Sequence, residues 1–216
     1  MRPLAVIASL LACGLLVTSA AQAGKPRLEQ KRLRPADMAL AKRTTLRASD
    51  LSPAWTRQQP TKPSNELPTC PGVDMDFSAF TITGTARSSF ELRGASVDSQ
   101  VEVFKSRSDA AGDFRKGTSA PALRCLGRWL RDESAKAQPG VRIVSSRLLS
   151  RPRVGDRAVL YRVVMDVPTD AGRVRVFVDL IGFQRGRTVV TLGSSNVGAP
   201  LRGQLVLARK VAARSR

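Results

Sequence analysis

Two pairs of acidic residues have a spacing that could support hydrolysis. Asp74 and Asp76 lie two positions apart, and Asp132 and Glu133 are adjacent near the predicted end of a helix. Paired carboxyl groups can share the general acid and general base roles of a hydrolase. Both pairs fall at the ends of predicted elements, where solvated charge is the usual finding. A carboxylate-dependent hydrolase of the cell envelope is therefore an alternative expectation and not the leading one.

The sequence of 216 residues contains no histidine. This composition excludes Ser-His-Asp and Cys-His nucleophile systems and all histidine-based zinc sites. It also removes the commonest general base near neutral pH. Carboxylate chemistry, a Ser-Lys pair or no chemistry at all are the remaining alternatives. We expect a protein that is not an enzyme and that needs no metal or other cofactor.

Positive charge dominates the composition. Lys and Arg number 36 against 17 Asp and Glu, which gives a formal net charge of +19. Such a surface attracts anionic partners over a distance that salt shortens. Arg162, Arg173 and Arg175 fall on one predicted strand face, and guanidinium groups pair bidentately with phosphate or carboxylate. We expect them to bind an anion; an ordinary solvated sheet face is the alternative.

The first residues predict export. Met1-Arg2 is followed by an apolar stretch over 4–17, and Ala21-Gln22-Ala23 places small residues before Gly24. This pattern is typical of a signal peptide over 1–23, cleaved between Ala23 and Gly24. The predicted location is secreted or extracytoplasmic. A lipid anchor through Cys13 is one alternative, and an uncleaved membrane anchor is the other.

Removing the signal peptide leaves Cys70 and Cys125 as the cysteines of the mature chain. In an oxidising compartment two cysteines indicate one disulfide bond, with two free thiols as the alternative. Nucleic acid is not an expected partner. One Tyr and two Trp offer no stacking platform for bases, and export argues against such a partner.

Residues 24–35 are basic and polar, which predicts a flexible tether, and 36–216 then form a single domain. Apolar periodicity predicts helices over 36–47, over 106–134 with an interruption at 117–119, and over 200–213. It predicts strands over 81–92 with a bend or bulge at Gly84, and over 97–105, 141–149, 157–167, 173–183 and 188–193. The alternation within the strands predicts one buried face. The expected fold is α+β, with an antiparallel sheet of about six strands and helices packed on one face.

Four short motifs carry a resemblance to a known family. They are 50–55 (DLSPAW), 101–106 (VEVFKS) with Cys125 downstream, 154–159 (VGDRAV) and 185–190 (RGRTVV). In this order they resemble the extracellular sensor domain of mycobacterial-type Ser/Thr kinases and its free-standing secreted relatives. The resemblance implies a sheet-and-helix fold with a cleft that binds a ligand and does not catalyse. Those domains typically hold two disulfides, whereas this sequence supplies one pair, and it carries no kinase.

The leading expectation is a secreted, non-enzymatic binding or sensor-like module of the cell envelope, with an unknown ligand. A small molecule, an anionic envelope polymer or an anionic lipid head group would be its partner. Peripheral membrane association fits the basic charge. We expect a monomer. A basic protein that binds anionic wall polymer or lipid head groups is an alternative, beside the hydrolase.

Overall fold

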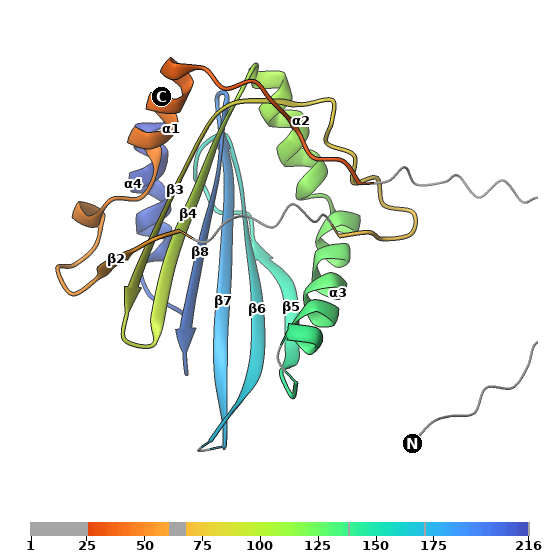
Figure 1. Cartoon of the computed structure of the whole chain (residues 1–216), viewed down its shortest axis with the longest axis vertical. Helices are drawn as coiled ribbons and strands as arrows, with labels where there is room; N and C mark the ends of the chain where they lie inside the picture. Colours follow the sequence, from red (N-terminus) through yellow and green to blue (C-terminus); the bar gives the residue numbers. More distant parts are fainter. Residues whose placement is uncertain (1–25, 61–67, 138, 171, 216) are drawn as a thin grey trace, which may run out of the picture.

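The computed structural model describes residues 26–60, 68–137, 139–170 and 172–215. Its elements follow the predicted order of a helix, a hairpin, a helical region, four strands and a helix (Figure 1). They are β1 (Gln30–Lys31), α1 (Pro35–Thr44), the 3₁₀ helix η1 (Ala48–Asp50), β2 (Thr56–Gln58), β3 (Thr81–Leu92), β4 (Ala95–Phe104), α2 (Arg107–Gly117), α3 (Ala120–Ala137), β5 (Arg142–Ser150), β6 (Arg157–Thr169), β7 (Gly172–Arg185), β8 (Thr188–Val197) and α4 (Gln204–Arg214).

The strands form one sheet of eight strands in the order β1-β3-β4-β8-β7-β6-β5, with β2 also paired to β3. All pairs are antiparallel except β1 with β3. The six long strands are those that the sequence predicts. The additional two, β1 and β2, are only two and three residues long. Segments this short carry no readable alternation of polar and apolar residues.

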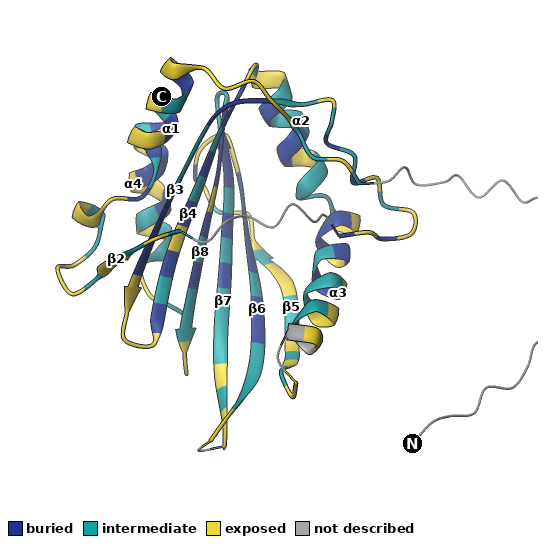
Figure 2. Cartoon of the chain, viewed as in Figure 1, coloured by how far each residue is buried: buried dark blue, intermediate teal, exposed yellow. Residues whose placement is uncertain are grey.

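Helices cover both faces of the sheet, so the prediction of helices on one face is wrong. Leu160 packs in a cluster with Ala208 of α4, whereas its neighbour Tyr161 packs with Leu123 of α3. Successive strand residues point to opposite faces, so α3 lies across the sheet from α4. Helices α1 and α4 lie on one side, and α2 and α3 on the other (Figure 1). Buried residues accordingly run along the central strands between the two helix pairs (Figure 2).

Residues 30–34 are hydrogen-bonded to the sheet. They belong to the stretch 24–35 for which the sequence predicts a flexible tether. The backbone N–H groups of Gln30, Arg32 and Arg34 donate to carbonyl oxygens of residues 80, 82 and 83 at 2.9, 2.9 and 2.7 Å. Helix α1 begins directly after this segment, at Pro35. The segment satisfies the open backbone groups at the start of β3, a role that needs few apolar side chains.

Cys70 and Cys125 form a disulfide bond, as predicted, with their Cα atoms 5.8 Å apart. The bond attaches the loop that precedes β3 to helix α3. The predicted signal peptide, its cleavage site at Ala23 and Gly24, and Cys13 lie outside the described residues. No helix within the described part of the chain is long and apolar enough to cross a membrane.

We predict that replacing both cysteines by serine lowers the free energy of unfolding by about 4 kcal/mol, because the bond closes a long loop in the unfolded chain. The loop spans 55 residues. Urea unfolding of the oxidised protein and of the double variant measures the difference. Equal stabilities would contradict a structural role for the bond.

Gly84 marks the predicted irregularity in β3, since the register with β4 shifts between Ile82 and Gly84. A Cβ atom at this position would lie 2.3 Å from the carbonyl oxygen of Asp37, in the backbone of α1. The missing side chain is therefore what allows α1 to lie this close to the sheet.

Gly84→Ala should destabilise the protein by about 1–3 kcal/mol, because the backbone of α1 must move to make room. Gly193→Ala in β8 is the matched control: its Cβ would meet Leu180 at 3.6 Å, an ordinary contact. Urea unfolding should show a loss for Gly84→Ala and little change for Gly193→Ala. Similar losses in both variants would overturn this account.

Candidate anion-binding groove

One side of helix α3 carries a ridge of arginines. Arg124, Arg128 and Arg131 follow one another at intervals of four and three residues, so they lie on the same side of the helix. All three side chains are exposed. The adjacent side of the helix packs into the core through Leu123, Leu126 and Leu130. The ridge therefore lies along the outer margin of α3, beside the sheet.

Helix α3 lies very close to strands β5 and β6 at Gly127. A Cβ atom there would be 2.6 Å from Ser146 Oγ and 2.8 Å from Tyr161 Oη. The buried Tyr161 hydroxyl donates to the carbonyl oxygen of Leu123 at 3.2 Å. This hydrogen bond and the missing side chain hold the helix against the sheet.

A groove of about 430 Å³ lies between this side of α3 and strand β5. We call it the α3–β5 groove. Arg124, Arg128 and Arg131 line it from the helix, and Arg151 lines it from the turn after β5. Its other lining residues are uncharged apart from Arg147: Ala120, Leu123, Gly127, Ser146, Leu148 and Tyr161. No carboxylate is among the described residues that line it.

Arg147 contributes to the groove mainly through its backbone. It is the register partner of Arg162, and cross-strand partners point to the same face. The neighbours Ser146 and Leu148 are partners of Val163 and Tyr161, which face α3. The side chain of Arg147 therefore points to the sheet face opposite the groove.

A second cavity of about 540 Å³ adjoins the groove and shares Arg151 with it. We call it the α2 cavity. Arg115, Arg153 and Arg157 add further positive charge to its lining. Its one carboxylate among the described residues, Asp156, is bonded to Arg107 at 3.0 Å and accepts the Gly186 N–H.

The groove arginines have no ion-pair partner among the residues that the structure describes. Seven ion pairs form in that part of the chain, and none includes Arg124, Arg128, Arg131 or Arg151. Like charges at i and i+4, such as Arg124 and Arg128, destabilise a helix by about 0.2–0.5 kcal/mol. The ridge therefore has an electrostatic cost that a bound anion would remove.

The arginines that the sequence singled out already have partners within the protein. Arg162 makes two hydrogen bonds to Asp179, at 2.6 and 2.8 Å, and these raise the pKa of Arg162. Arg175 is bonded to Asp166 at 2.8 Å, and Arg173 donates to the Gly140 carbonyl. The structure places all three on the sheet face opposite the groove, where Arg162 and Arg175 have carboxylate partners and Arg173 is held by a backbone carbonyl.

Asp74, Asp76 and Glu133 of the predicted carboxylate pairs are also engaged, and Asp132 is exposed on α3. The hydrogen bond from Lys116 lowers the pKa of Asp74, and hydrogen bonds from Ser78 lower that of Asp76. Glu133 is paired with Lys136 at 2.8 Å. A general acid needs a carboxyl group that stays protonated near neutral pH, and neither Asp74 nor Asp76 is held in that form.

No family model matches the chain, and no curated protein sequence matches it either. In the part of the chain that is described, no group of three or more acidic or cysteine side chains has an arrangement that could hold a metal ion.

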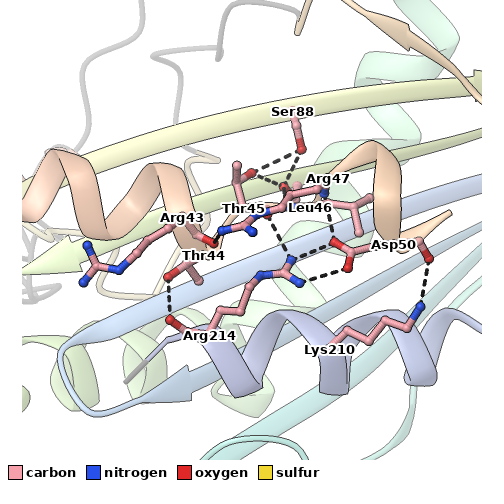
Figure 3. A network of polar contacts seen from close by, with 10 residues as sticks. Arg43, Thr44, Thr45, Leu46, Arg47, Asp50, Ser88, Lys210 and Arg214 are labelled. Atoms are coloured by element: carbon pink, nitrogen blue, oxygen red, sulfur yellow. Dashed lines mark hydrogen bonds and ion pairs between the residues drawn. The ribbon is translucent and has the colours of Figure 1, made fainter.

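A large polar network joins the C-terminal helix to the N-terminal region (Figure 3). Arg214 of α4 donates to both carboxylate oxygens of Asp50, at 2.9 and 2.7 Å, and to the Thr45 carbonyl. Lys210 donates to the Asp50 carbonyl. Burial alone would raise the pKa of Asp50, but these hydrogen bonds hold it below its usual range. The charges of Arg214 and Asp50 are paired with each other, although Arg214 Nε is buried without a hydrogen-bond partner among the described residues, and we interpret the network as structural.

Three carboxyl groups distant in sequence meet where α2 packs on the sheet, and sequence patterns gave no signal for them. Asp113 is 9% exposed and is hydrogen-bonded to Glu29. Burial, followed by the charges of Glu29 and Glu102, raises the pKa of Asp113 to about 8. Burial also raises the pKa of Glu102, although the positive charges of Arg87 and Lys31 oppose this. The folded protein therefore holds a proton here that the unfolded chain would release.

Because the pKa of Asp113 is raised on folding, its contribution to stability is complete below about pH 4 and is lost as the pH rises through about 8. We predict that Asp113→Asn removes the part of this dependence that is due to Asp113, leaves the part that is due to Glu102, and exceeds the wild type in stability at alkaline pH. Urea unfolding across this range should show a steeper loss of stability with pH in the wild type, by up to about 1.4 kcal/mol per pH unit. Asp132→Asn, at an exposed position on α3, is the control and should keep the wild-type slope.

Proposed function

We propose that this protein is a secreted, non-enzymatic binding module of the cell envelope, and that its α3–β5 groove binds an anionic ligand. One observation carries the proposal. Arg124, Arg128, Arg131 and Arg151 surround a groove whose described lining contains no carboxylate. By contrast, the arginines that the sequence singled out at 162 and 175 are each paired with an aspartate.

The groove supplies two kinds of contact. Its arginines provide planar donors that match the oxygens of phosphate or carboxylate. Leu123, Leu148 and the ring of Tyr161 provide an apolar floor, which strengthens charge interactions by reducing contact with water. The disulfide at Cys125 and the Tyr161 hydrogen bond fix α3 in the absence of ligand. A wall held in this way loses little conformational freedom when a ligand binds.

The proposed location has separate support. The N-terminal sequence has the pattern of a signal peptide, and the disulfide is compatible with an extracellular compartment. The resemblance to extracellular sensor domains points in the same direction. The hydrolase alternative gains nothing from the positions of Asp74, Asp76 and Glu133, because each is bonded to other groups of the fold.

We predict that Arg124→Gln/Arg128→Gln weakens the binding of tripolyphosphate, used as an anionic probe, by roughly tenfold. The estimate assumes that each lost arginine removes about 0.5–1 kcal/mol, as is usual for exposed charge pairs. Isothermal titration calorimetry at fixed ionic strength measures the affinity. Arg209→Gln, at an exposed position of α4 on the opposite face, is the control and should bind as the wild type does.

The same double variant should be slightly more stable than the wild type when no anion is present, because it removes the repulsion along α3. Adding the probe should then raise the melting temperature of the wild type more than that of the variant. If the double variant and Arg209→Gln bind the probe equally well, the groove is not the binding site.

A further inference from the structure

We infer that the ligand of the groove is a linear chain of phosphate groups, which runs from the α3–β5 groove past Arg151 into the α2 cavity. This inference rests on the proposed function and names the chemical class of its ligand. Its basis is the placement of the arginines: they follow one another along α3 and continue, through Arg151, to the lining of the α2 cavity.

The spacing along α3 is the first part of this argument. Arg124 and Arg131 lie about two helical turns, or about 10 Å, apart along the helix axis. A single phosphate group carries at most about two negative charges near neutral pH, fewer than the three positive charges of the ridge. A ligand that neutralises every arginine of the ridge must therefore carry more than one anionic group, and groups that succeed one another match this spacing.

The connection between the two cavities is the second part. Arg151 lines both of them, so it links the arginines of the ridge to those of the α2 cavity. Beyond Arg151 the α2 cavity adds Arg153 from the β5–β6 turn, Arg157 from the start of β6 and Arg115 from α2. None of these three has an ion-pair partner in the described part of the chain. The two cavities together therefore present more positive charges than one phosphate group can neutralise.

An acidic peptide fits this path less well. A peptide lying along the groove would be expected to add as a strand to β5, the last strand of the sheet. The register of β5 is irregular between Ile143 and Ser145 and again between Leu148 and Ser150. Irregularities of this kind prevent an edge strand from offering a straight row of hydrogen-bonding groups.

Nucleic acid, the other chain with repeated phosphates, lacks a surface for its bases here. Binding of single strands relies on exposed aromatic side chains that stack on bases. The aromatic residues that line the two cavities are Phe114 and Tyr161, and each is 4% exposed. The lining thus contacts phosphates through arginine and gives unstacked bases no aromatic partner. A phosphate chain without bases is the class that the lining favours.

The test compares tripolyphosphate with long-chain inorganic polyphosphate in calorimetric titrations of the full mature protein. Two exposed sites are changed separately: Arg153→Gln/Arg157→Gln in the α2 cavity and Arg124→Gln/Arg128→Gln in the groove. Arg209→Gln again controls for the loss of a positive charge outside the two cavities. Single-stranded DNA of matched charge and phosphatidylglycerol vesicles are the competing anions.

We expect the long chain to bind the wild type at least roughly tenfold more tightly than tripolyphosphate does, because it reaches more arginines. Arg153→Gln/Arg157→Gln should weaken the long chain by roughly tenfold and leave tripolyphosphate unchanged. It should also reduce the slope of log K against log salt for the long chain by about one for each arginine removed.

The inference is overturned if the long chain binds no more tightly than tripolyphosphate, or if Arg153→Gln/Arg157→Gln behaves like Arg209→Gln. It is also overturned if DNA or the vesicles displace bound polyphosphate when their own phosphate concentration is lower than that of the polyphosphate. These outcomes leave the proposed function intact when Arg124→Gln/Arg128→Gln still weakens tripolyphosphate. If tripolyphosphate fails to bind the wild type, or if that variant binds it normally, the proposed function fails as well.

Discussion

The shortage of carboxylates governs where positive charge can be compensated in this protein. With 17 acidic residues against 36 basic ones, more than half of the basic side chains cannot have an acidic partner of their own. Some of the acids lie where an uncompensated charge would be most costly, at sites of low exposure between elements. Asp179 and Asp50 are examples, since their side chains are 1% and 7% exposed and each receives two hydrogen bonds from one arginine. Arginines at the margin of α3 remain uncompensated as a consequence.

Much of the fold could be predicted because its long strands alternate clearly and end at turn residues. The bounds of β3 match the expected strand at 81–92, and the disulfide bond expected between Cys70 and Cys125 is present. The second layer of helices was missed, although β6 carries a signal for it: Leu160 and Tyr161 are adjacent, and both are buried. Consecutive buried residues in a strand indicate a sheet that is covered on both faces.

The site was harder to predict than the fold. Strand alternation correctly placed Arg162, Arg173 and Arg175 on a common face, but the register that sets Arg162 opposite Asp179 exists only in the folded sheet. The helical spacing of Arg124, Arg128 and Arg131 is visible in the sequence and could have indicated a basic ridge. The contribution of Arg151 to the groove could not be predicted from the sequence, because it depends on how α3 packs against β5. The carboxyl cluster at Asp113 likewise depends on long-range packing.

Gly127 determines how deep the α3–β5 groove is. The hydroxyl groups of Ser146 and Tyr161 occupy the space in which its side chain would lie, so a larger residue requires these hydroxyl groups or α3 itself to move. An outward shift of α3 would carry the whole arginine ridge with it and would change the width of the groove along its length. For the binding function that we propose, this position sets the room beneath the ridge although it has no side chain and offers no charge.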